Sequence, residues 1–309
     1  MRAQPMIEDP DWPRASAWLA ARRPRRAGVP LLAVLGAPLS RTSISPSGAD
    51  ATPAAVRSAL ARFSTFAAPW RVALEELDVV DRGDVPLGDL AVEPALDAVE
   101  HAVREAAAGA DLLVLLGGDN AITRPGVRGL APDLDRAGLL TLDAHHDVRG
   151  FHAGVTNGTP VRGLLGDGLP GRNVVQIGVG AFTNSAVHRR WAEDRGVTVV
   201  MVDEARAEGV GPCVAHHLNA LAARCDRIWV DLDVDVLDAA FAPGCPGARP
   251  GGLVPSELHH AALAAGRHPA VRGIDIVEVD ATADAGGVTV DNAALCLLHA
   301  AAGLALRGA

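Results

Sequence analysis

Residues 139–147, with the sequence LLTLDAHHD, pass from an apolar run directly into two acids and two histidines. A run that ends abruptly in carboxylates is typical of a buried parallel strand that presents polar groups at its C-terminal edge. The pattern recurs where residues 112–116 (LLVLL) precede 117–120 (GGDN), and where 228–230 (IWV) precede 231–235 (DLDVD). Ligands bind at this edge in open α/β sheets. We therefore expect the three segments to meet at one site.

Apolar runs alternate with helical stretches along most of the chain. Strands separated by helices of ten or more residues favour an α/β fold with a parallel sheet covered on both faces. We assign residues 1–30, which are rich in Arg, Pro and Trp, to an N-terminal extension with a peripheral helix near 16–21, and residues 31–309 to one catalytic domain. The expected strands are 31–35, 72–77, 112–116, 139–142, 174–177, 198–202, 228–230 and 273–277. The expected helices are 53–63, 91–108, 185–194, 212–223, 255–265 and 292–306.

The composition narrows the possible partners and the compartment. With 309 residues, of which 49% are hydrophobic, the chain can bury a sizeable core. Its net charge of −9 argues against a nucleic-acid partner, which requires a basic face. No run approaches the ~18 apolar residues of a membrane span, so no membrane partner is expected. The four cysteines form no Cys-x-x-Cys pair, which indicates reduced thiols in a cytoplasmic enzyme.

The acidic segments have the composition of a metal site. Alternate residues of a strand share a face, so Asp233 and Asp235 can point to one centre, and Asp143, His145 and Asp147 have the same two-residue spacing. An oxygen-rich set with a single imidazole suits Mn²⁺ better than zinc or copper. Each acid alone could instead cap a helix or shape a loop. Three clusters at strand ends favour a centre with two metal ions, which would make hydroxide available for hydrolysis.

The order of these motifs resembles that of the ureohydrolase superfamily, which contains arginase, agmatinase and formimidoylglutamase. The resemblance rests on Gly-Gly-Asp-x, Asp-Ala-His-x-Asp and Asp-x-Asp-x-x-Asp, followed by APG at 242–244. Residues 275–279 (DIVEV) resemble the family's strand that presents a glutamate to the substrate. The similarity covers about residues 31–306. It implies a three-layer α/β/α sandwich around an eight-stranded, mainly parallel sheet, in subunits that assemble as homo-oligomers, usually trimers or hexamers.

The resemblance also implies two Mn²⁺ ions per subunit. The metal ligands that it implies are Asn120, Asp143, His145, Asp147, Asp233 and Asp235. Asp143 and Asp233 would bridge the two ions, Asn120 and Asp147 would complete the first, and the remaining pair the second. Glu278 would accept hydrogen bonds from the amidine-like group under attack. We expect Asp147 to relay a proton to the leaving amine.

Two departures from the family pattern bear on the substrate. Arginases and agmatinases usually have histidine where this chain has Asn120, and histidine again in place of Asn157. The second histidine is thought to shuttle protons, which asparagine cannot do near pH 7. At both positions the chain resembles formimidoylglutamases, which also lack these histidines. The favoured reaction is thus hydrolysis of N-formimidoyl-L-glutamate to L-glutamate and formamide, a late step of histidine degradation in this family. An agmatinase or other guanidino-acid hydrolase, and an inactive metal-binding homologue, remain alternatives.

Candidate substrate-binding residues follow from the two carboxylates of that substrate, which require cationic or amide donors. Arg149 comes directly after the second acidic segment, and Arg162 follows Asn157 in the chain. Asn184, in the loop after the strand 174–177, is a further possible donor. Glu278 and Asn157 complete the expected substrate pocket.

Overall fold

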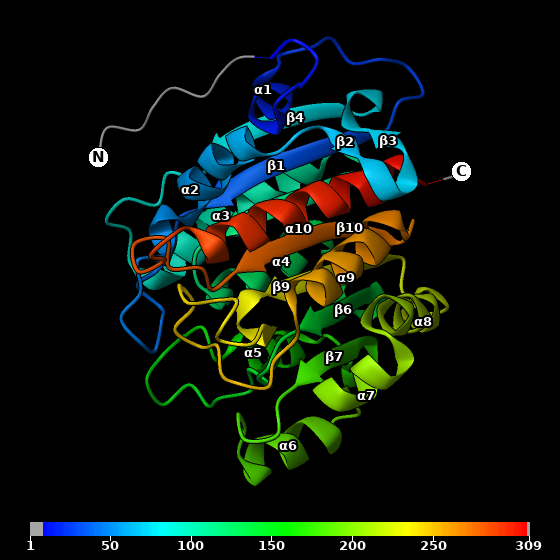
Figure 1. The fold of residues 1–309 in the computed structure, drawn as a ribbon. Helices are drawn as coiled ribbons and strands as arrows, with labels where there is room; N and C mark the ends of the chain where they lie inside the picture. The colour runs from blue at the N-terminus through cyan, green and yellow to red at the C-terminus, as the bar shows by residue number, and fades with distance from the viewer. Residues whose placement is uncertain (1–8, 308–309) are drawn as a thin grey trace.

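The structure, a computed structural model, describes residues 9–307. Residues 1–8 of the expected N-terminal extension and the last two residues of the expected catalytic domain, 308 and 309, lie outside the described residues. The described chain forms three layers, with helices packed on both faces of a central sheet (Figure 1). This is the α/β/α sandwich that the motif resemblance implies.

The central sheet has eight strands in the order β4-β1-β5-β10-β9-β6-β7-β8, and every neighbouring pair is parallel. The strands are β1 (Leu31–Ala37), β4 (Asp78–Asp84), β5 (Leu112–Gly117), β6 (Ala137–Leu142), β7 (Val174–Val179), β8 (Thr198–Met201), β9 (Arg227–Asp233) and β10 (Val271–Val277). The three acidic segments follow β5, β6 and β9, which lie with β10 in the middle of the sheet. Their carboxyl ends therefore meet at one edge.

Each face of the sheet packs against its own set of helices, because alternate side chains of a strand point to opposite sides. In β1, Leu32 and Val34 belong to one buried cluster, and Ala33 and Leu35 to the other. The first face carries α1 (Ala15–Ala20), α2 (Thr52–Ala59), α7 (Val202–Glu208), α8 (Val210–Ala222), α9 (Pro255–Arg267) and α10 (Val288–Ala305). The opposite face carries α3 (Val92–Ala107), α4 (Thr123–Leu130), α5 (Pro160–Asp167) and α6 (Ala186–Glu193).

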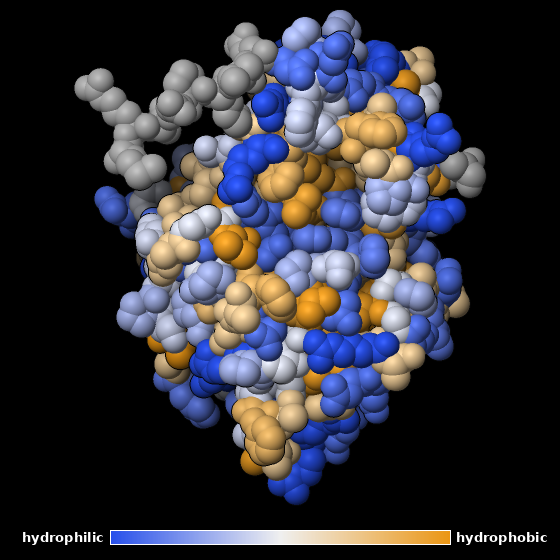
Figure 2. Space-filling view, viewed as in Figure 1, coloured by the Kyte–Doolittle hydropathy of each residue, from blue (hydrophilic) through white to orange (hydrophobic). Residues whose placement is uncertain are grey.

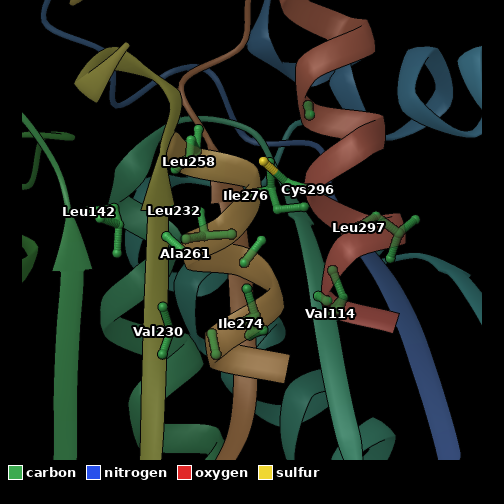
Figure 3. Packing of buried hydrophobic residues seen from close by; sticks show 14 of the residues in the cluster. Val114, Leu142, Val230, Leu232, Leu258, Ala261, Ile274, Ile276, Cys296 and Leu297 are labelled. Atoms are coloured by element: carbon green, nitrogen blue, oxygen red, sulfur yellow. The ribbon is translucent and has the colours of Figure 1, made fainter. Parts of the chain in front are cut away.

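Helices α9 and α10 cover the middle of the sheet. Figure 3 shows Leu258 and Ala261 of α9 beside Ile276 of β10, with Cys296 of α10 against the same layer. Small residues let these helices approach closely, since a Cβ at Gly266 would lie 2.1 Å from the carbonyl oxygen of Ala300. The buried apolar layer holds the four central strands, and thus the acidic segments, in fixed register.

One strand assignment made from the sequence is wrong. Residues 72–77 do not join the central sheet; they contain the two-residue strand β3 (Val72–Ala73), which pairs with β2 (Phe66–Ala67), and a 3-10 turn, Leu74–Glu76. The sheet strand is β4, whose sequence DVVDRGD lacks an apolar run because β4 lies at the edge and is half exposed. Polar residues are common on such edge strands. The short helices α4, α5 and α7 were also not anticipated.

Helix α10 has the length and composition of a membrane span, which the sequence analysis did not anticipate. However, 72% of its 18 residues are buried inside the protein, where it packs on α9 and α2. A core helix of an α/β protein has these properties. On the side of the molecule where α10 lies, hydrophilic residues separate the exposed apolar residues into small groups (Figure 2).

Candidate metal centre and substrate pocket

Four neighbouring strands deliver the polar side chains to one edge of the sheet. The chain leaves β5 through Gly118, where a Cβ would lie 1.9 Å from the carbonyl oxygen of Leu39, so only glycine fits this close approach. A 3-10 turn, Asn120–Ile122, then begins, and the Asp119 carboxylate caps it by accepting the N–H of Ala121. A second 3-10 turn, Val234–Val236, follows β9 in the same way. These turns hold the polar residues after each strand in place.

Two site residues adopt left-handed backbone conformations. Asp147 has φ 49° and Glu278 has φ 64°, backbone angles that residues other than glycine rarely adopt. Such residues cost about 1–3 kcal/mol each and persist where the surrounding structure holds them. The backbone N–H of Glu278 donates to the carbonyl oxygen of Gly118 over 3.0 Å, which fixes the turn after β10. The turn directs the Glu278 carboxylate toward the acids of the neighbouring strands.

The acids and the histidine form two groups that share one residue. Oxygen atoms of Asp143, Asp147 and Asp233 lie within 4.8 Å of one another, and so do ligand atoms of Asp143, His145 and Asp235. In the second group, His145 Nδ1 lies 2.7 Å from Asp235 Oδ2. Carboxylates in two adjoining groups with one imidazole form the donor set that Mn²⁺ prefers. The shared residue, Asp143, has the position required of a bridging ligand.

Burial and mutual repulsion raise the pKa values of most of these acids. Burial raises the pKa of Asp143 to about 7 and that of Glu278 to about 8. Burial, followed by repulsion from Asp143, also raises the pKa of Asp147 well above its usual value. Burial opposes the charged form of His145, but Asp235 and Asp143 raise its pKa to about 12. A divalent cation would neutralise this cluster of acids. The residues present therefore fit the metal that the sequence predicted.

Asn120 lies at the border of the first group. Its side-chain Nδ2 is 2.7 Å from Asp147 Oδ2, and its Oδ1 accepts the hydroxyl proton of Thr123 over 2.5 Å. Its backbone N–H donates to Glu278 Oε1 over 2.7 Å. The structure thus brings all six predicted ligands together, and their individual roles as ligands remain a proposal.

Asn157 joins two parts of the site. Its Oδ1 accepts the backbone N–H of Ile44 over 3.1 Å, and its Nδ2 donates to Glu278 Oε1 over 3.0 Å. Because a backbone N–H can only donate, this arrangement fixes the orientation of the amide. Asn157 lines the pocket, but both ends of its side chain have protein partners. In this arrangement it orients Glu278 and the loop after β1.

The substrate pocket lies directly outside the acids. Arg149 and Asn184, both predicted from the sequence, line it. Asn184 donates to the carbonyl oxygen of Ala144 over 3.0 Å and accepts the N–H of His146 over 2.9 Å, so it supports the segment that carries His145. Arg149 makes no side-chain hydrogen bond or ion pair within residues 9–307. Its guanidinium is therefore the available cation beside the acids.

Arg162, the other arginine predicted to bind substrate, does not line this pocket. It donates to the carbonyl oxygen of Val148 over 2.6 Å, and its guanidinium stacks on Trp191 at 4.0 Å from the ring centroid. The helix α5 turns Arg162 toward α6 and away from the acids. The prediction of a direct substrate contact is therefore not supported by its position.

Two residues that line the pocket were not predicted, and neither was the contact that Asp119 of the first acidic segment makes. Arg249 and His188 line it, from the loop after β9 and from α6. Asp119 accepts hydrogen bonds from the N–H and hydroxyl of Thr42, which anchors the loop after β1. Arg249 lies in the long loop between the third acidic segment and α9, and its place after that segment was a usable signal. The sequence gives no signal for His188, because its position depends on the path of the chain after β7.

Comparisons with known proteins agree with this geometry. A family model described as "Arginase family" matches residues 31–303. The formimidoylglutamase of Halalkalibacterium halodurans is 36% identical over 270 residues, covering 86% of this chain and 85% of the relative. The crystal structure of formimidoylglutamase from Bacillus subtilis superposes with a TM-score of 0.91 at 32% identity, covering 100% of this chain and 97% of that one. A Trypanosoma cruzi formiminoglutamase structure with Mn²⁺ gives a TM-score of 0.84 at 25% identity, covering 96% of this chain and 100% of that one.

Proposed function

This chain belongs to the arginase family, and we propose that it is a manganese-dependent hydrolase that converts N-formimidoyl-L-glutamate and water to L-glutamate and formamide. In this reaction the water oxygen bonds to the formimidoyl carbon, and the bond from that carbon to the glutamate nitrogen breaks. The departing nitrogen takes up a proton and leaves as an amine. The family membership and the formimidoylglutamase relatives support the proposal.

The metal ligands proposed are Asn120, Asp143, His145, Asp147, Asp233 and Asp235, with two Mn²⁺ ions per subunit. Asp143 is common to both groups of ligand atoms, which supports its role as a bridging ligand. The chemistry that such a pair of ions supplies is activation of water at neutral pH. The protein residues around it bind and orient the substrate.

Glu278 is proposed to hold the amidine group. Its Oε1 already accepts two hydrogen bonds, from the Asn120 N–H and from the Asn157 amide. Oε2 is therefore the oxygen available to accept an N–H of the substrate. Amidine N–H groups donate well to a carboxylate, and this contact would keep the formimidoyl carbon beside the acids.

Asp147 is proposed to pass a proton to the leaving nitrogen. Its carboxylate lines the pocket beside the other acids, where a substrate nitrogen can reach it. A positioned carboxylate can carry a proton between reacting groups. Because Asn157 cannot exchange protons near pH 7, Asp147 is the better candidate for this step.

The substrate is indicated by one observation, the unpaired Arg149 in the same pocket as the acids. A carboxylate would satisfy its guanidinium, whereas the positively charged agmatine would be repelled. Arg249 lines the same pocket and adds a second guanidinium to it. A guanidino acid carries a carboxylate as well, so it remains the second candidate within the same chemistry.

We also propose that the enzyme acts in the cytoplasm as a homo-oligomer, a trimer or hexamer, without a nucleic-acid or membrane partner. All four cysteines are buried free thiols, which supports a reducing compartment. Size-exclusion chromatography with light scattering would report the number of subunits.

Product analysis tests the proposed reaction. The Mn²⁺-loaded protein is incubated separately with N-formimidoyl-glutamate, agmatine, arginine and guanidinobutyrate. Formamide and glutamate from the first substrate alone support the proposal. Urea from a guanidino compound would overturn the substrate assignment, and no product from any of the four would indicate an inactive homologue.

A further inference from the structure

Thr123 makes two hydrogen bonds that a single hydroxyl proton cannot serve. Its Oγ1 lies 2.5 Å from Asn120 Oδ1 and 2.7 Å from Asp275 Oδ2, and both of these oxygens accept. A hydroxyl carries one proton, together with lone pairs that can accept. When Asp275 Oδ2 acts as an acceptor, one of the two acceptors is left without a donor. Leaving a buried acceptor without a donor is unfavourable.

Turning the Asn120 amide by half a turn removes the conflict. The two ends of an amide have the same shape, and their hydrogen-bond partners decide which end is which. In the turned orientation Asn120 Nδ2 donates to Thr123 Oγ1, and Thr123 donates its proton to Asp275 Oδ2. The amide oxygen then takes the present place of Nδ2, which lies 2.7 Å from Asp147 Oδ2. Two oxygens this close are favourable around a cation, or when a proton lies between them.

We propose that Thr123 is a positioning residue that directs the Asn120 oxygen into the metal centre, with Asp275 as the acceptor that sets the direction of the hydrogen bonds. This inference rests on the metal centre proposed above and adds a residue that lies outside the three acidic segments. Asn120, unlike histidine, has a donor end and an acceptor end, so a neighbour must select which one meets the metal. Thr123 performs that selection.

Bulk water does not compete for this arrangement, although Asp275 also interacts with Asp231 and Trp229 of β9. Thr123 and Asp275 are fully buried, and Asn120 is 1% exposed, so bulk water does not reach the three groups. Thr123 is the first residue of α4, directly after the turn that carries Asn120, and Asp275 lies in the middle of β10. Both neighbours are therefore held by regular structure. A rigid hydroxyl between a fixed acceptor and a ligand is typical of the residues that orient metal ligands.

Mn²⁺ binding to metal-stripped protein tests the inference. Calorimetry and the electron paramagnetic resonance spectrum measure the binding. We expect Thr123→Val to weaken one Mn²⁺ site by about 10- to 100-fold, the range usual for residues that support a ligand. Thr123→Ser, which keeps the hydroxyl, should bind within about threefold of wild type. Thr141→Val is the matched control, because Thr141 is equally buried and its hydroxyl has no partner within residues 9–307. It should bind as wild type does.

A second pair of variants separates orientation from packing. In Asn120→Asp both side-chain ends are oxygens, so no selection is needed. Adding Thr123→Val to Asn120→Asp should therefore change the Mn²⁺ affinity by less than about threefold, although the same change weakens binding strongly beside Asn120. Equal losses in both backgrounds, or wild-type affinity in Thr123→Val, would overturn the inference. If Thr123→Val does not fold, Thr123→Ala replaces it in both backgrounds. A wild-type protein that binds no Mn²⁺ would instead overturn the metal centre itself.

Discussion

Asn157 Nδ2 donates to Glu278 Oε1 over 3.0 Å, so this asparagine orients the glutamate. The other end of the same amide holds the loop after β1 through the N–H of Ile44. One short side chain therefore connects a pocket wall to the residue proposed to bind the amidine.

Asn157→Ala should lower kcat/KM by about 10- to 100-fold, because a hydrogen bond to a charged group contributes about 1.5–3 kcal/mol. Steady-state kinetics on formimidoylglutamate measure the effect. Asn173→Ala is the control, since Asn173 is a buried asparagine whose amide donates only to the backbone, to Asp135 and Ala137. It should lower the unfolding temperature and leave kcat/KM unchanged. Wild-type kcat/KM in Asn157→Ala would show that Glu278 needs no such donor.

Asp147→Asn should lower kcat by about 100-fold or more at saturating Mn²⁺, the lower range for removal of a general acid or base. The variant keeps the shape of the side chain but cannot pass a proton. Metal content is measured on the same samples, so that lost metal is not mistaken for lost catalysis. Asp203→Asn, at a side chain that is 92% exposed on α7, controls for the charge change. Full activity with normal metal content in Asp147→Asn would rule out the relay.

The sequence predicts the buried parts of this protein better than its edges. Strands covered on both faces have continuous apolar runs, so β5, β6 and β9 and the acids after them could be located. The edge strand β4 is half exposed, and its acids conceal it. Arg162 was misplaced because the direction of its side chain depends on the rotation of α5. The role of Thr123 could not be predicted from the sequence, because it depends on a contact with Asp275, which is 152 residues away.

Arg149→Ala should raise KM for formimidoylglutamate by about 10- to 100-fold with little change in kcat, because it removes a charged partner of a substrate carboxylate. Arg162→Ala is the matched control. It should change KM by less than about threefold and lower the unfolding temperature, since Arg162 packs on Trp191 and supports Val148. Comparing KM for both variants on one substrate decides between them. An equal rise in KM for both would contradict the assignment of Arg149.

The protein stripped of metal by a chelator should become less stable as the pH rises. Burial raises the pKa of Asp275 to about 7 and that of Glu278 to about 8, against about 4 for unfolded acids. Between pH 4 and 8 these two acids hold protons that the unfolded chain has lost, so their contribution to the free energy of unfolding falls as pH rises. Burial lowers the pKa of His259 to about 4, which opposes this trend only below about pH 6.5. His145, whose pKa is raised to about 12 by Asp235 against the effect of burial, acts in the same direction above about pH 6.5. The pKa of Asp235 is lowered, so it changes stability only below this range.

Mn²⁺ should reverse this trend, because a cation that binds only the folded protein stabilises it and binds better when the acids are ionised. Thermal unfolding at pH 5.5 and pH 8, with chelator and with Mn²⁺, measures both effects. We expect the chelated protein to unfold several degrees lower at pH 8 than at pH 5.5, and the gain from Mn²⁺ to be larger at pH 8. A chelated protein that is more stable at pH 8 would show that the buried acids are ionised without a cation. The electrostatic argument for the metal centre would then fail.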